Sequence, residues 1–134
     1  MDVSRINWLA TIVAGLSAFM VGGIWYSKSL FGNAWMVDSN LTVEQIQGGN
    51  KGKIFGFTII FSLIMAVNLA MFLADAKTDL AWGTTAGFLA GIWTFGAIAI
   101  HSLFELKSWR YIFINGGYSL VSLTVMGAII GAWR

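Results

Sequence analysis

The chain has 134 residues, of which 57% are hydrophobic and 10% are charged, and its net charge is +2. A soluble domain usually carries about 25% charged residues, so a chain this apolar cannot cover a water-facing surface and is typical of an integral membrane protein. The absence of cysteine, the single histidine (His101) and the scattered basic residues exclude disulfides and a multi-histidine metal site within one copy, and give no sign of nucleic acid as a partner.

The first apolar stretch, residues 8–26, contains no charged residue. At about 1.5 Å per residue it is long enough to cross a hydrocarbon core of about 30 Å. Backbone groups in lipid must satisfy one another's hydrogen bonds, so the stretch is predicted to be a helix. A cleaved signal peptide is the alternative, but the stretch ends in Trp25-Tyr26 and lacks an A-x-A-like cleavage site, which favours a retained span.

Residues 27–53 form the only sizeable segment outside the predicted spans. The stretch SKSLFGNAWM (27–36) can place its large apolar side chains on one helical face, which predicts a short helix lying in the membrane interface. Thr42 and Gln45 have the spacing of a capping box, which predicts that a further short helix begins there and runs through Ile46.

Three more stretches are free of charge and long enough to span a membrane: 54–74, 80–104 and 111–133. The connections between them are short, so consecutive spans are predicted to be antiparallel neighbours. The sequence therefore predicts an all-α membrane protein with a single transmembrane domain, residues 1–134. Its four transmembrane helices form an up-down bundle with a short interfacial helix between helices 1 and 2.

Trp and Tyr side chains prefer the two membrane interfaces, so their positions test the number of spans. Only Trp93 and Tyr118 lie well inside a predicted span. With four crossings, the others form two belts of interfacial anchors: Trp8, Trp82 and Trp133 on one side, and Trp25, Tyr26, Trp35, Trp109 and Tyr111 on the other.

The basic residues give a prediction of orientation. Five of the eight Lys and Arg residues lie in the loops 27–53 and 105–110, and three lie on the opposite side. Cytoplasmic loops are usually the richer in Lys and Arg. We therefore expect these two loops in the cytoplasm and both termini outside.

Every predicted span carries a stripe of small residues, which lets helix backbones approach closely in lipid. The clearest helix-packing residues are Gly83, Gly87 and Gly91 in the third span and Gly127 and Gly131 in the fourth. One interpretation is packing within a single bundle. The other is that at least one stripe forms an interface with a second copy or with a partner protein.

Four polar residues near the end of the third span form a candidate polar pocket. His101 and Glu105 are four residues apart and share a helix face, and Asn115 and Tyr118 lie at a similar depth on the next span. Ionisable residues inside a membrane often mark function, and a His–Glu pair can relay a proton or orient a polar substrate.

The same residues also allow a structural interpretation. In it, Glu105 lies at the lipid headgroups, hydrogen-bonds His101 and pairs with Lys107 or Arg110. Asn68, inside the second span, is expected to make an interhelical hydrogen bond and to bind no ligand.

The stretch GGIWYSKSLFGNAWM (22–36), with LFE (103–105) and GYSLVSLTVMGAIIGAW (117–133), resembles a bacterial family of small membrane proteins, domain-of-unknown-function family 1761. The resemblance covers nearly the whole chain. It implies a four-helix protein of the bacterial cytoplasmic membrane with no established activity. A common family pattern has proline after Trp-Tyr-Ser, where this chain has Lys28, so a rigid turn is not expected there.

Three functions are compatible with the sequence. The favoured one is a non-enzymatic structural or accessory bundle, without cofactor or metal, that contacts the lipid bilayer and self-associates or joins a larger membrane complex. The second is an oligomeric small-solute or ion transporter or channel with its polar pocket around His101, Glu105 and Asn115. The third is a lipid-modifying enzyme with His101 as base, which lacks a second convincing catalytic group.

Overall fold

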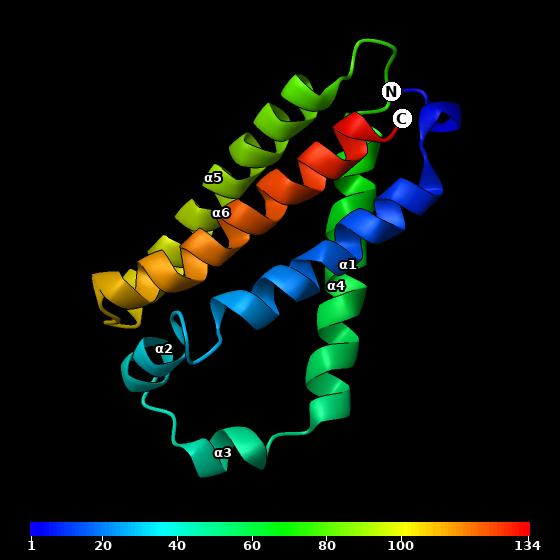
Figure 1. Cartoon of the computed structure of the whole chain (residues 1–134). Helices are drawn as coiled ribbons and strands as arrows, with labels where there is room; N and C mark the ends of the chain where they lie inside the picture. Colours follow the sequence, from blue (N-terminus) through cyan, green and yellow to red (C-terminus); the bar gives the residue numbers. More distant parts are fainter.

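The computed structural model describes all 134 residues and consists of helices and their connections (Figure 1). A short 3-10 helix, η1 (Val3–Arg5), leads into the first span, and two short helices, α2 (Gly32–Asp38) and α3 (Val43–Gln47), follow it. Four helices are long and apolar enough to cross a membrane: α1 (Trp8–Trp25), α4 (Lys51–Phe72), α5 (Leu80–Phe104) and α6 (Trp109–Ala132). The predicted all-α fold and the four spans are confirmed.

Polar side chains fix where the helices begin. Each long helix follows a residue whose side-chain oxygen accepts a hydrogen bond from a backbone N–H in the first turn: Asn7, Asn50, Asp79 and Ser108. The predicted capping box forms at α3, where the Gln45 backbone N–H donates to Thr42 Oγ1 at 3.1 Å and the Thr42 N–H donates to Gln45 Oε1 at 2.8 Å. The helix boundaries are therefore set locally by the sequence.

The four long helices pack in the order α5, α6, α1, α4, and the ring is not closed. In Figure 1, α5 and α6 run side by side, α1 lies along α6, and α4 crosses α1 and diverges from the α5–α6 hairpin. The prediction that α4 and α5 are packed neighbours is wrong. They meet near their short connection, where the rings of Phe72 and Trp82 have centroids 6.2 Å apart. A short connection fixes only the ends of two helices, and the small residues of α4 face α1.

The closest helix contact is between α5 and α6. A Cβ atom added to Gly83 would collide with the carbonyl oxygen of Gly127, and one added to Gly87 would collide with that of Leu123. A Cβ atom on Gly91 would come within 2.8 Å of Leu120 Cα. The remaining two glycines of the predicted stripes, Gly127 and Gly131, meet the backbone of α5 in the same way. The glycine stripes of α5 and α6 therefore pack inside one chain.

Alanines form the second close contact, between α1 and α4. Ala14 and Ala18 of α1 are buried, as are Ala66 and Ala70 of α4. They join one apolar core with Leu123, Met126 and Ile130 of α6. The core thus lies where α1 meets both α4 and α6, and it leaves one side of α4 without a protein neighbour.

Candidate functional site

The structure does not assemble the four residues of the candidate polar pocket into one site. His101 and Glu105 lie at the exposed end of α5, and neither side chain makes a hydrogen bond or an ion pair. The expected ion pair of Glu105 with Lys107 or Arg110 is also wrong. Lys107 lies over the ring of Tyr111, with its Nζ 5.4 Å from the ring centroid. The His–Glu pair therefore forms no hydrogen-bonded chain along which a proton could move.

Arg110 pairs instead with Asp38 at the end of α2. Its Nε and Nη2 each donate a hydrogen bond of 2.7 Å to the Asp38 carboxylate. These hydrogen bonds from the guanidinium hold the pKa of Asp38 below its usual range, although partial desolvation opposes them. The pair ties the short helix α2 to the start of α6. Spacing within the sequence gives no signal for it, because 72 residues separate the partners.

Asn115 and Tyr118 face α1, away from His101. The Tyr26 hydroxyl donates to Asn115 Oδ1 at 2.6 Å, and the Trp25 indole N–H donates to the Ile114 carbonyl at 2.8 Å. The rings of Tyr26 and Tyr118 have centroids 5.5 Å apart. Trp25 and Tyr26, predicted only as interfacial anchors, thus also hold the end of α1 against α6.

The other predicted anchors occupy the helix ends. Trp8, Trp82 and Trp133 lie at the end of the long helices that carries the chain termini. Trp109 and Tyr111 lie at the opposite end, and Trp35 lies in the short helix α2 beside them. These positions match the two interfaces that the span limits define. Their contact with lipid headgroups stays a prediction.

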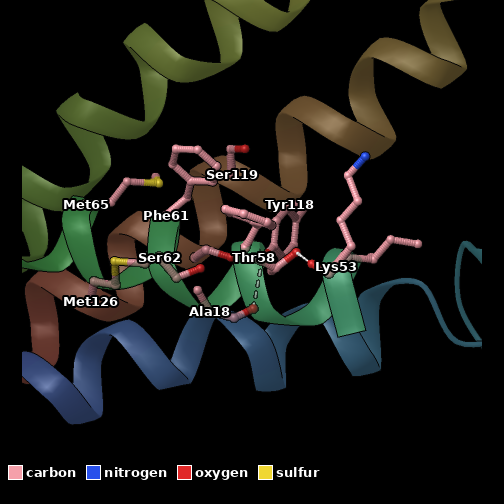
Figure 2. A pocket seen from close by; sticks show the side chains of 12 residues that line it. Ala18, Lys53, Thr58, Phe61, Ser62, Met65, Tyr118, Ser119 and Met126 are labelled. Carbon is pink, nitrogen blue, oxygen red and sulfur yellow. Dashed lines mark hydrogen bonds between the residues drawn. The ribbon is translucent and has the colours of Figure 1, made fainter. Parts of the chain in front are cut away.

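A cavity of about 680 Å³ opens between α1, α4 and α6 (Figure 2). Figure 2 shows Lys53 at one end of the cavity and Met65 and Met126 at the other. The Tyr118 side chain lies beside it and donates a hydrogen bond of 2.9 Å to the Ala18 carbonyl. Of the four predicted pocket residues, Tyr118 alone lines this cavity.

A second hollow, a groove of about 620 Å³, lies between α4 and α5 where the two helices diverge. Its lining is mainly apolar and includes Phe72 and Trp82, with Asn68 on α4 and Trp93 on α5. The interhelical hydrogen bond expected for Asn68 is absent, because its Nδ2 donates to Ile64 of its own helix at 3.0 Å. No residue pattern predicts this groove, since the groove depends on how α4 is tilted.

No group of three or more His, Asp or Glu residues lies close enough to hold a metal ion. No curated protein and no solved structure matches the chain. Residues 9–131 do match a family described as "Protein of unknown function (DUF1761)". Because this match covers nearly the whole chain, the protein belongs to the DUF1761 family.

Proposed function

We propose that this protein is a non-enzymatic membrane component that associates with a second copy of itself through the groove between α4 and α5. The observation that carries the proposal is a pair of polar side chains in that groove. Asn68 offers an unused acceptor and Trp93 an unused donor, and each faces the lipid.

Trp93 has an unusual position for a tryptophan. It lies next to the midpoint of the 25-residue helix α5, and its side chain is 84% exposed. Tryptophan normally lies at the membrane interfaces, where its indole N–H can bond to water or headgroups. The Trp93 N–H has no partner within the chain, and hydrocarbon supplies none. A protein neighbour with an acceptor would satisfy it.

Asn68 is the complementary group. One of its two amide N–H groups donates to the Ile64 carbonyl, while its Oδ1 accepts no hydrogen bond within the chain. In a two-fold dimer each contact occurs twice and at the same membrane depth, so Asn68, which has a free acceptor and a second amide N–H, can pair with the Asn68 of a second copy. Polar bonds between membrane helices contribute about 1 kcal/mol each, and the apolar walls of the groove add packing. A second copy is therefore the occupant that best suits the groove.

The glycine stripes of α5 and α6 are not available to a second copy. They are occupied by the α5–α6 contact, so association needs another surface. The non-enzymatic part of the proposal is supported by the chemistry of the two hollows, because neither is lined by a carboxylate or an imidazole. The transport alternative is weaker, because His101 and Glu105 lie outside the cavity that Tyr118 lines.

We also propose that the protein resides in the bacterial cytoplasmic membrane with both termini outside. The support is the excess of Lys and Arg in the segments 27–53 and 105–110. In this orientation α2, α3 and the Asp38–Arg110 pair lie on the cytoplasmic side.

Native mass spectrometry of the full chain, gently extracted from its own membrane, tests the association. We expect a homodimer whose fraction falls in Asn68→Leu and Trp93→Leu. Phe88→Leu is the matched control, because Phe88 is exposed on α5 but does not line the groove. A chain that is monomeric throughout contradicts the proposal. A foreign subunit at fixed stoichiometry, without a second copy, would instead make the protein an accessory component.

A further inference from the structure

The Ser and Thr hydroxyl groups on the four spans fall into two sets. In one set the hydroxyl donates to a carbonyl three or four residues earlier on its own helix: Thr11, Ser17, Thr58, Thr84, Thr85, Thr94 and Thr124. Four serines make no side-chain hydrogen bond: Ser62, Ser102, Ser119 and Ser122. Three of these four line the cavity between α1, α4 and α6.

Ser122 is the most constrained of the three. It is 2% exposed and lines the cavity. Its Oγ makes no hydrogen bond of good geometry, and its polar neighbour is the Tyr118 hydroxyl, which already donates to the Ala18 carbonyl. A buried polar group without a partner is costly, so such a group is usually matched by a ligand or by water. Ser62 and Ser119 add two further free hydroxyls to the same wall.

The three serines lie near the middle of the membrane. Ser62 lies near the midpoint of α4, and Ser119 and Ser122 lie on either side of the midpoint of α6. A charged headgroup is strongly disfavoured at that depth. The polar part of a ligand that reaches these serines is therefore uncharged.

The cavity lining also restricts the polarity of the ligand. Its polar side chains are hydroxyls and the ammonium of Lys53, and none is a carboxylate or an amide. The hydroxyl protons of Thr58 and Tyr118 are used within the chain, so the donors left for a ligand are the serine hydroxyls and Lys53. This set favours a ligand whose polar atoms are acceptors, such as carbonyl oxygens, and disfavours a cation.

The aromatic part of the lining favours a ligand with a flat ring and an apolar tail. The aromatic side chains of Phe57, Phe61 and Tyr118 line it. Phe57 and Phe61 are more than half exposed, so the cavity is open to lipid on that side and a tail can extend into the bilayer. A volume of about 680 Å³ holds a substituted ring and part of a tail.

We infer that this cavity binds a neutral, lipid-soluble carbonyl compound of the quinone class. Its ring carbonyl oxygens accept hydrogen bonds from Ser122 and from Ser62 or Ser119, and its tail passes Phe57 and Phe61 into the bilayer. The site shares Met65 with the groove between α4 and α5, but its three serines and the groove's Asn68 and Trp93 line different hollows. The test of quinone binding is therefore distinct from the test of self-association.

Lys53 provides the means to separate this ligand from an anionic lipid. It lies nine residues before Ser62, which is about 14 Å along α4. A ring bound at the serines does not need Lys53. A carboxylate or phosphate head at the membrane surface would need it.

The test is a titration of decylubiquinone into the full-length protein in nanodiscs, with empty nanodiscs as the blank. We expect saturable binding of one quinone per chain. Ser122→Ala should raise the Kd about fivefold, the effect of one lost hydrogen bond, and Ser62→Ala is the second variant if Ser122→Ala does not fold. Ser102→Ala is the control, because Ser102 is 4% exposed and its side chain makes no hydrogen bond, but it lies outside the cavity.

Two further ligands complete the experiment. Decylbenzene, which has a ring and a tail but no carbonyl, should not bind saturably, and Lys53→Gln should leave quinone binding unchanged. The inference is overturned if quinone uptake matches that of empty nanodiscs, if decylbenzene binds equally well, or if Ser102→Ala weakens binding as much as Ser122→Ala. It is also overturned if only decanoate binds and Lys53→Gln abolishes that binding, since the site would then take an anionic amphiphile.

Discussion

Replacing Gly127 with alanine should destabilise the fold through one methyl group. The added Cβ atom would collide with the Gly83 carbonyl oxygen and would also lie 3.0 Å from Gly87 Cα. Both contacting atoms belong to the backbone, so the clash cannot be relieved by a change of side-chain rotamer. The two helices must therefore move apart.

The magnitude follows from two opposing effects. Overpacking costs about 1–3 kcal/mol, and a contact between backbones falls at the upper end of that range. A separation of about 0.5–1 Å forfeits a quarter to a half of each dispersion contact along the interface. Alanine regains about 1 kcal/mol of helix propensity over glycine. We therefore expect a net loss of about 2 kcal/mol in the free energy of unfolding.

Gly96→Ala is the matched control on the opposing helix. A Cβ atom there meets nothing within 4 Å, so the helix propensity acts alone and the fold should be unchanged or slightly more stable. The measurement is reversible unfolding in dodecylmaltoside micelles with a rising mole fraction of SDS, followed by far-UV circular dichroism. Equal stability of the two variants would refute the reasoning that the glycine stripes bring α5 and α6 into backbone contact.

Four further predictions follow from the contacts and the orientation described above. Asp38→Asn should speed amide hydrogen exchange in α2 but change global stability by only about 1 kcal/mol, because the Arg110 side chain of the pair is more than half exposed and the pair holds only a short helix. Since the pKa of Asp38 is lowered, protection of α2 in the unaltered chain should hold at neutral pH and be lost only as the pH falls through that lowered pKa. Tyr26→Phe should cost about 1 kcal/mol through its lost bond to α6, whereas Tyr111→Phe, whose hydroxyl makes no bond within the chain, should cost little in the same SDS assay. Because the chain has no cysteine, a membrane-impermeant maleimide should label Ser4→Cys in intact cells and Gly48→Cys only after lysis; the reverse pattern would contradict the proposed orientation.

The spans and the helix starts were predictable because they depend on local chemistry. An uncharged run of sufficient length must be helical in lipid, and a capping box needs only two residues three apart. The order in which the helices pack was not predictable in the same way. All four spans carry small residues, so the sequence does not say which stripe faces which, and the neighbours predicted from the short connection at 75–79 were wrong.

The candidate pocket shows how helix rotation limits such predictions. Spacing places His101 and Glu105 on one face of α5, but the glycine contacts with α6 decide where that face points. Ser102, adjacent to His101, is 4% exposed, and successive residues turn by about 100° around a helix. His101 is therefore turned toward the exterior. The depth of Tyr118 in its span could be predicted from the sequence. The free serines could not, because whether a serine hydroxyl bonds to its own helix depends on its side-chain conformation.

The central position of α1 has a consequence for how the protein is made. Within this chain α1 is the first span to leave the ribosome, and its partners Ile114, Asn115 and Tyr118 belong to the last. Until α6 is inserted, the side chains of Trp25 and Tyr26 have no acceptor from α6 and must be accommodated by lipid headgroups or by the insertion machinery. During biosynthesis, α1 therefore cannot complete its contacts until α6 has been inserted. The fold then forms by the docking of helices that already cross the membrane.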